Sequence, residues 1–130
     1  MITASNFIQA LKLMMPTVTF FNGSIDKTNK TCMGVYARGG ANPHKALGGL
    51  ENTSYATLPL SILVHWTENA DNCEKIANEL YEKLASADDL IVGGKRVILL
   101  NLLDSSPANV GRDANNIAEM VIRLNLIYER

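Results

Sequence analysis

The chain contains few of the residues that mark metalloenzymes and disulfide-stabilised domains. Its 130 residues include two cysteines, Cys32 and Cys73, and two histidines, His44 and His65. No HxxxH, HxE or CxxC spacing occurs, so the usual sequence signals of a zinc site are missing. Cys32 falls in an expected strand and Cys73 on the apolar face of an expected helix, which predicts buried thiols rather than a disulfide.

An excess of charge of either sign is also missing. The chain has 12 basic and 13 acidic residues, which give a formal net charge of −1. Nucleic-acid binders usually carry a basic stripe, so neither sequence-specific nucleic acid nor a membrane surface is an expected partner. The N-terminal segment lacks a basic leader and a long apolar run, so no secretion signal or membrane span is expected there. Length and composition predict a single domain over residues 1–130.

Motifs for phosphate binding and nucleophilic catalysis are absent as well. The pairs Gly39-Gly40 and Gly48-Gly49 fit neither GxxxxGK[ST] nor GxGxxG, and no expected helix begins directly after them. Asp104 precedes two serines, but a catalytic triad also needs a base, and neither histidine is placed by the sequence to supply one. We therefore predict no enzyme, no cofactor, and no catalytic or metal-binding residues.

Two amphipathic helices are predicted. Thr3 or Ser5 can cap the first, which ends before Pro16. Its buried stripe is Ala4, Phe7, Ile8, Leu11, Met14 and Met15. The second helix is expected to begin at a capping box of Asp71 and Glu74 and to end near Ser86. Its apolar stripe is Cys73, Ile76, Ala77, Leu80, Tyr81 and Leu84.

The remaining periodic segments predict strands. The strongest is 57–67, in which Leu58, Leu60, Ile62, Val64 and Trp66 alternate with residues of the opposite face. The other expected strands are 17–22, 31–38, 96–103 and 117–128, with a short one at 90–92 in a Gly93-Gly94 hairpin. The first three strands are expected to form an antiparallel meander. The predicted fold class is α+β: a mostly antiparallel sheet with two helices packed on one face, in the order α-β-β-β-α-β-β.

Two long loops and an apolar outer face suggest contacts beyond the monomer. The loops are 39–55 and 104–116, and a small domain rarely keeps such long irregular segments without a use for them. Leu63, Val121 and Ile127 fall opposite the core face of their strands. This combination points to a component of an assembly.

The segment GGLENTSYATLPLSILVHWTENADNCEKIANELYEKL resembles the central part of the bacteriophage minor capsid proteins that are grouped with the tail terminators of long-tailed phages. The stretch Ser105–Asp113 before a long last strand fits the same pattern, and element order agrees along nearly the whole chain. The resemblance implies a sheet with two helices on one side and a structural role. It also implies a ring, expected to be a hexamer, that caps the tail tube at the head–tail junction of the virion after assembly in the host cytoplasm. The expected partners are other copies of the chain, the tail-tube protein and the head–tail connector protein.

Two hypotheses of different classes remain open at this stage. The first is a structural ring component of a phage or prophage virion. The second is a small α+β ligand-binding or regulatory domain that uses the glycine-rich loop as a lid. Under the first, loop 39–55 is an arm, and deletion of residues 40–49 should leave the monomer folded but impair assembly.

The candidate assembly contacts combine the long loops with the outer faces of the strands. His65 is expected at the sheet surface or in an interface rather than as a ligand or base, and His44 in an exposed loop. The candidates are Arg38, His44, Lys45, Leu47, Leu50, Tyr55, Leu63, His65, Arg112, Val121, Arg123 and Ile127.

Overall fold

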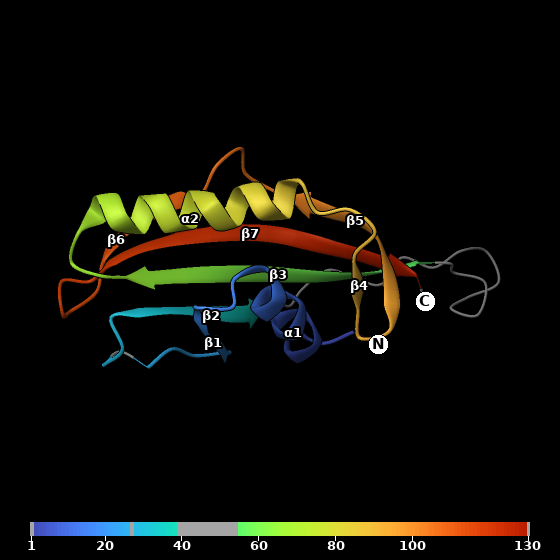
Figure 1. Ribbon diagram of the computed structural model, residues 1–130, viewed down its shortest axis with the longest axis horizontal. Helices are drawn as coiled ribbons and strands as arrows, with labels where there is room; N and C mark the ends of the chain where they lie inside the picture. Colours follow the sequence, from blue (N-terminus) through green and yellow to red (C-terminus); the bar gives the residue numbers. More distant parts are fainter. Residues whose placement is uncertain (1, 27, 39–54, 130) are drawn as a thin grey trace.

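Two helices and seven strands make up the computed structural model, which describes residues 2–26, 28–38 and 55–129 (Figure 1). The helices are α1 (Ala4–Met14) and α2 (Ala70–Ala85). The strands are β1 (Thr19–Asn22), β2 (Thr31–Ala37), β3 (Tyr55–Trp66), β4 (Ile91–Val92), β5 (Lys95–Leu102), β6 (Ala108–Arg112) and β7 (Ala118–Glu129). The α+β class and the mostly antiparallel sheet are confirmed.

The sheet has the strand order β1-β2-β3-β7-β5-β4, and β6 also pairs with β7. The expected antiparallel pairing of β2 with β3 is confirmed, but β1 runs parallel to β2, so the predicted three-strand meander is wrong. The connection after β1 does not turn back as a hairpin. Ile25 Cγ2 would lie 2.7 Å from a Cβ at Gly34, so this connection lies against the face of β2. A connection that crosses the sheet in this way brings the chain back to the end at which β1 began. β2 therefore starts there and runs parallel to β1.

Strands β5 and β6 occupy the same edge of β7, one after the other. β5 pairs with β7 from Tyr128 to Leu124, and β6 continues from Val121 to Ala118. The segment 104–116, predicted to be a long loop, therefore contains a short edge strand, β6, with irregular residues on either side. The prediction failed because Ala108–Arg112 is exposed along its whole length and shows no alternation of apolar and polar residues.

Both helices begin at side-chain caps. Thr3 Oγ1 accepts a hydrogen bond from the Asn6 amide, and the Asn6 side chain accepts one from the Thr3 amide, so the predicted cap of α1 is confirmed. The cap of α2 is Asn69, whose Oδ1 accepts from the amides of Asp71 and Asn72. The predicted capping box of Asp71 and Glu74 is wrong by two residues, although α2 ends at the expected Ser86 cap.

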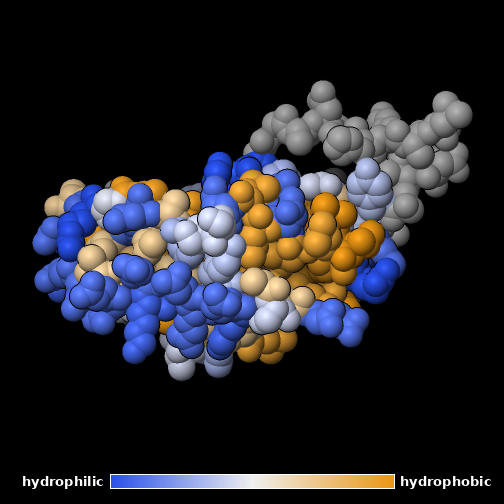
Figure 2. Space-filling model, turned by 90° about the horizontal axis from the view of Figure 1, so that it is seen from above, coloured by the Kyte–Doolittle hydropathy of each residue, from blue (hydrophilic) through white to orange (hydrophobic). Residues whose placement is uncertain are grey.

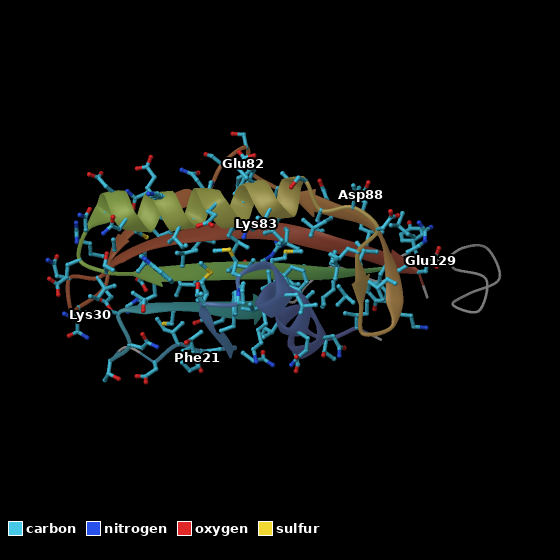
Figure 3. All side chains as sticks on the ribbon, in the orientation of Figure 1. Phe21, Lys30, Glu82, Lys83, Asp88 and Glu129 are labelled. Carbon is cyan, nitrogen blue, oxygen red and sulfur yellow. The ribbon has the colours of Figure 1, made fainter. Side chains whose placement is uncertain are left out.

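One face of the sheet carries the core. Buried side chains at alternating positions are Met33 and Val35 of β2, Leu60, Ile62 and Val64 of β3, and Ile122, Leu124 and Leu126 of β7. α2 runs along β7, and α1 lies near β1 and β2 and also contacts β4 (Figure 1). Lys83 Nζ of α2 donates a hydrogen bond to the Met14 carbonyl at the end of α1, 2.8 Å away (Figure 3). The two helices thus cover one face, as the sequence predicts.

Candidate functional site

The face of β2, β3 and β7 that points away from the helices is called the outer face below. Its residues are those that alternate with the core residues along each strand. Cross-strand register places Leu63 beside Val121, Ser61 beside Arg123 and Thr57 beside Ile127. The predicted apolar contacts Leu63, Val121 and Ile127 therefore lie on two adjacent strands, and each side chain is half-buried.

Strand β5 extends the apolar part of the outer face. Leu99 pairs with Ile127 and is 52% exposed, and its neighbour Ile98 is 47% exposed. A register shift between Val97 and Leu99 makes this possible, because it breaks the alternation and turns Leu99 away from the core. Figure 2 shows apolar side chains gathered toward the end of the molecule at which β5 lies. The sequence analysis missed Leu99, since a bulge leaves no mark in a simple alternating pattern.

Arg123 forms the main charged contact of this face. Its Nη2 and Nε atoms lie 2.8 and 3.0 Å from the two carboxylate oxygens of Asp104, in the segment between β5 and β6. The hydrogen bond from Arg123 holds the pKa of the Asp104 carboxyl below its usual value. Along β7, Arg123 lies between Val121 and Asn125 on the outer face. The apolar side chain of Val121 therefore has a charged neighbour.

Arg38 directly follows β2, and its side chain extends across β3 to β7. Its Nε donates to the Leu60 carbonyl at 3.2 Å, and its Nη2 donates to the Leu124 carbonyl and Asn125 Oδ1, both at 2.8 Å. The Arg38 amide donates to the Pro59 carbonyl, at the point where the pairing of β2 with β3 stops. A proline fits there because it has no amide hydrogen for a further ladder bond. The guanidinium of Arg38 therefore joins β3 to β7 within the monomer.

His65 departs from its expected position at the sheet surface. It is on the outer face of β3, but its exposed fraction is 0%. Its Nδ1 lies 3.0 Å from Glu119 Oε2 and 3.8 Å from Asp113 Oδ2. The turn between β6 and β7 brings Asp113 over this end of the sheet, which pattern reasoning along β3 alone could not reveal. His65 is therefore covered by this turn and does not lie at the sheet surface, and its role as an assembly contact stays a prediction.

The other predicted contacts divide into two groups. Tyr55 is 38% exposed at the start of β3, and the exposed Arg112 donates to the carbonyls of Glu68 and Asn116. His44, Lys45, Leu47 and Leu50 lie outside the described residues.

Both cysteines are buried free thiols, as predicted. Burial, reinforced by the negative charge of Glu119, raises the pKa of the Cys73 thiol to about 11. Burial also raises the pKa of Cys32, with further contributions from Asp26 and Glu119. A thiol with a raised pKa holds little of the nucleophilic thiolate near neutral pH. Neither cysteine has the environment of a catalytic nucleophile.

The fold and the outer face define a class of protein: a two-layer α+β domain in which, over the described ranges, both helices cover one face of the sheet and the opposite face is partly apolar. Such a face is typical of proteins that work by contact with other chains. Within the described ranges, no helix has the length and apolar character needed to cross a bilayer.

The comparison with protein families identifies the chain. Residues 7–130 match the family described as bacteriophage tail terminator protein, and the chain belongs to this family. It is therefore a structural protein of the phage tail that contacts other phage tail or head proteins. A search of individually curated proteins found no match to the chain. The family resemblance found in the sequence is confirmed, and the structural hypothesis is favoured over the ligand-binding one.

Proposed function

We propose that the chain assembles into a closed ring, expected to be a hexamer, that caps the tail tube and contributes to head–tail joining. The observation that carries the proposal is the apolar part of the outer face. Leu63 and Val121 pair directly across β3 and β7, and Leu99 pairs with Ile127 at the next edge. These side chains keep exposed area that a contact with another chain would bury.

The energetics support such a contact. Burial of apolar area contributes roughly 25 cal/mol per Å², so several half-buried or exposed aliphatic side chains that enter one interface favour association. A ring needs a contact between two different surfaces of neighbouring subunits, repeated until the rotation closes. The outer face is one such surface, and the tail-tube protein, the connector protein and a second copy of the chain are the proposed partners. The ring would lie at the tail end of the virion after assembly in the host cytoplasm.

The test replaces one residue of the outer face with a charged one. Val121→Asp places a carboxylate in the centre of the proposed contact, and burial of an unpaired charge is costly. Leu13→Asp is the matched control, because Leu13 is an apolar residue of α1 that is 86% exposed and belongs to the opposite layer. Light scattering coupled to size-exclusion chromatography measures the oligomer, and cosedimentation measures binding to purified tail tubes.

The expected result is a cyclic oligomer for the unmodified chain and for Leu13→Asp. For Val121→Asp we expect at least a tenfold loss of association, about 1.4 kcal/mol. Circular dichroism confirms that the variant is folded. A strictly monomeric chain that also fails to bind tail tubes would contradict the proposal, as would a Val121→Asp variant that assembles normally.

A further inference from the structure

Three side chains with metal-ligand chemistry meet at one end of the sheet. His65 comes from β3, Glu119 from β7, and Asp113 from the turn between β6 and β7. One ligand atom of each lies within 4.8 Å of the other two. We propose that these residues form a binding site for a divalent first-row transition metal ion of the Zn²⁺ class. The site lies next to the Leu63–Val121 pair on the outer face, and the proposal does not depend on ring formation.

The backbone fixes the three side chains without help from an ion. His65 and Glu119 are direct cross-strand partners in the β3–β7 ladder. Asp113 uses Oδ1 to accept hydrogen bonds from the amides of Asn115 and Ile117, both at 2.9 Å. Asn116 has φ of +64°, the left-handed conformation that lets this turn close. A site whose ligands are already in place loses little conformational entropy when it binds an ion.

The charge balance of the cluster favours a cation. The exposed fractions of the side chains are 0% for His65, 9% for Asp113 and 17% for Glu119. Two carboxylates in such a sheltered place face the same imidazole nitrogen, at 3.0 and 3.8 Å. A divalent ion placed between these side chains would contact all three ligand atoms. Placing two negative charges together with little water is costly unless a positive charge accompanies them.

The donor set selects the kind of ion. One imidazole nitrogen and two carboxylate oxygens suit Zn²⁺ and its neighbours, while Mg²⁺ and Ca²⁺ prefer ligand sets made only of oxygen. Ligands that bind Zn²⁺ at about 2.0–2.2 Å lie roughly 3.3 Å apart in a tetrahedral site. The observed distances from Nδ1 to the carboxylates bracket this value, so small side-chain rotations would complete the site. The partial exposure of Glu119 provides a route for the ion and room for water as a further ligand.

Glu119→Gln is the best variant for a test, because it removes one charge and keeps an acceptor for the His65 ring. Glu129→Gln is the matched control, since Glu129 is on the same face of β7 but pairs with Arg96 at the other end of the strand (Figure 3). His44→Gln is a second control, which tests whether the other histidine of the chain accounts for binding. The full-length, tag-free chain is dialysed against a chelator and titrated with Zn²⁺ by calorimetry, with Mn²⁺, Mg²⁺ and Ca²⁺ as comparators.

We expect one Zn²⁺ per chain and a rise in melting temperature on binding. Glu119→Gln should weaken Zn²⁺ binding at least tenfold, Asp113→Asn should also weaken it, and both control variants should bind like the unmodified chain. Co²⁺ should give a d–d spectrum without a thiolate charge-transfer band, because neither cysteine belongs to the ligand set. Circular dichroism without metal shows whether each variant is folded.

Several outcomes would overturn the proposal. They are the absence of stoichiometric Zn²⁺ binding, binding that His44→Gln abolishes and Glu119→Gln leaves intact, and a thiolate band with Co²⁺. Binding of Mg²⁺ or Ca²⁺ as tight as that of Zn²⁺ would also contradict the assignment to an ion that prefers nitrogen.

Discussion

At the scale of single residues, the start of α2 shows how two side chains of similar chemistry can differ in role. Asn69 and Asp71 both have a side-chain oxygen that can cap a helix. The structure uses Asn69, which has β-region backbone angles of φ −92° and ψ 111°. Asp71 lies two residues further on, in the first turn of the helix, where its negative charge is close to the positive end of the helix dipole.

Asn69→Ala is expected to lower the free energy of unfolding by about 1 kcal/mol, because two amides of the first turn lose their acceptor. Asn72→Ala is the control: it removes an exposed amide side chain from the same turn, and alanine has a high helix propensity. Urea unfolding followed by circular dichroism measures both variants. Equal destabilisation by the two substitutions would show that the cap does not depend on Asn69.

Other residue-scale features depend on contacts between distant segments, and the sequence did not reveal them. Gly34 has an ordinary backbone conformation, but an added Cβ would lie 2.7 Å from Ile25 and 3.0 Å from the Ser24 carbonyl. His65 is buried by a turn almost fifty residues away in the chain. Strand alternation correctly assigned His65 to the face opposite the core, but alternation along one strand carries no information about what covers that face.

At the scale of elements, the edge of β7 is the least regular part of the sheet. β5 and β6 pair with it in succession, and the residues between them leave the ladder. The Leu103 amide donates to the Arg123 carbonyl, and the Arg123 side chain binds Asp104. Tyr81 of α2 also donates to the Asp104 carbonyl at 2.9 Å. These contacts attach the segment between β5 and β6 to β7 and to α2.

The pairing of Asp104 with Arg123 predicts a pH dependence of stability. The pKa of Asp104 is lowered in the folded chain, so the pair stabilises the fold above the unfolded pKa of about 3.9. That contribution is lost as the pH falls through the lower folded value. Asp104→Asn should therefore reduce the urea midpoint at pH 7, and the difference from the unmodified chain should shrink as the pH falls below about 3.9.

Asp88→Asn is the control for the loss of a surface carboxylate, because Asp88 is exposed in the turn before β4 and forms no ion pair within the described ranges. Asp26 and Glu68 also have a lowered pKa, but they are present in both chains and cancel in the comparison. A difference between Asp104→Asn and the unmodified chain that is the same at pH 7 and pH 3 would contradict this role of the ion pair.

The two unexpected element arrangements have a common physical origin. The parallel pairing of β1 with β2 depends on how the connection crosses β2, and the position of β6 depends on a free edge of β7. Both follow from contacts between segments rather than from local periodicity. The two helices, the hairpin at Gly93-Gly94 and the long strands β3 and β7 were predictable, because each has its own period or turn signal.

At the scale of the whole molecule, the asymmetry of the sheet is the feature most closely related to function. One face is covered by α1 and α2, and on the other face Leu63 of β3 and Val121 and Ile127 of β7 are half-buried among the described residues. The sequence predicted this asymmetry through the apolar residues opposite the core, and it predicted Leu63, Val121 and Ile127 correctly as members of one face. Leu99 was missed, because its direction depends on the bulge in β5.

The chemistry of the outer face predicts how assembly responds to salt. The formal net charge of the chain is −1, so long-range repulsion between subunits is weak. Raising NaCl from about 0.1 M to about 1 M shortens the screening length from roughly 10 Å to 3 Å, which weakens contacts between exposed charges. Apolar burial is not weakened by such screening. We therefore expect the oligomer fraction, measured by light scattering at fixed protein concentration, to stay constant or rise across this range.

This response distinguishes the apolar contact from an interface held by surface ion pairs. Arg123 and Asp104 lie next to the apolar residues, and charged groups at such a rim mainly affect the rate and salt dependence of association. Asp104→Asn should therefore leave the oligomer fraction at 1 M NaCl unchanged, while Val121→Asp should lower it at every salt concentration. Dissociation of the unmodified oligomer into monomers at 1 M NaCl would show that charge pairs, rather than the outer face, hold the subunits together.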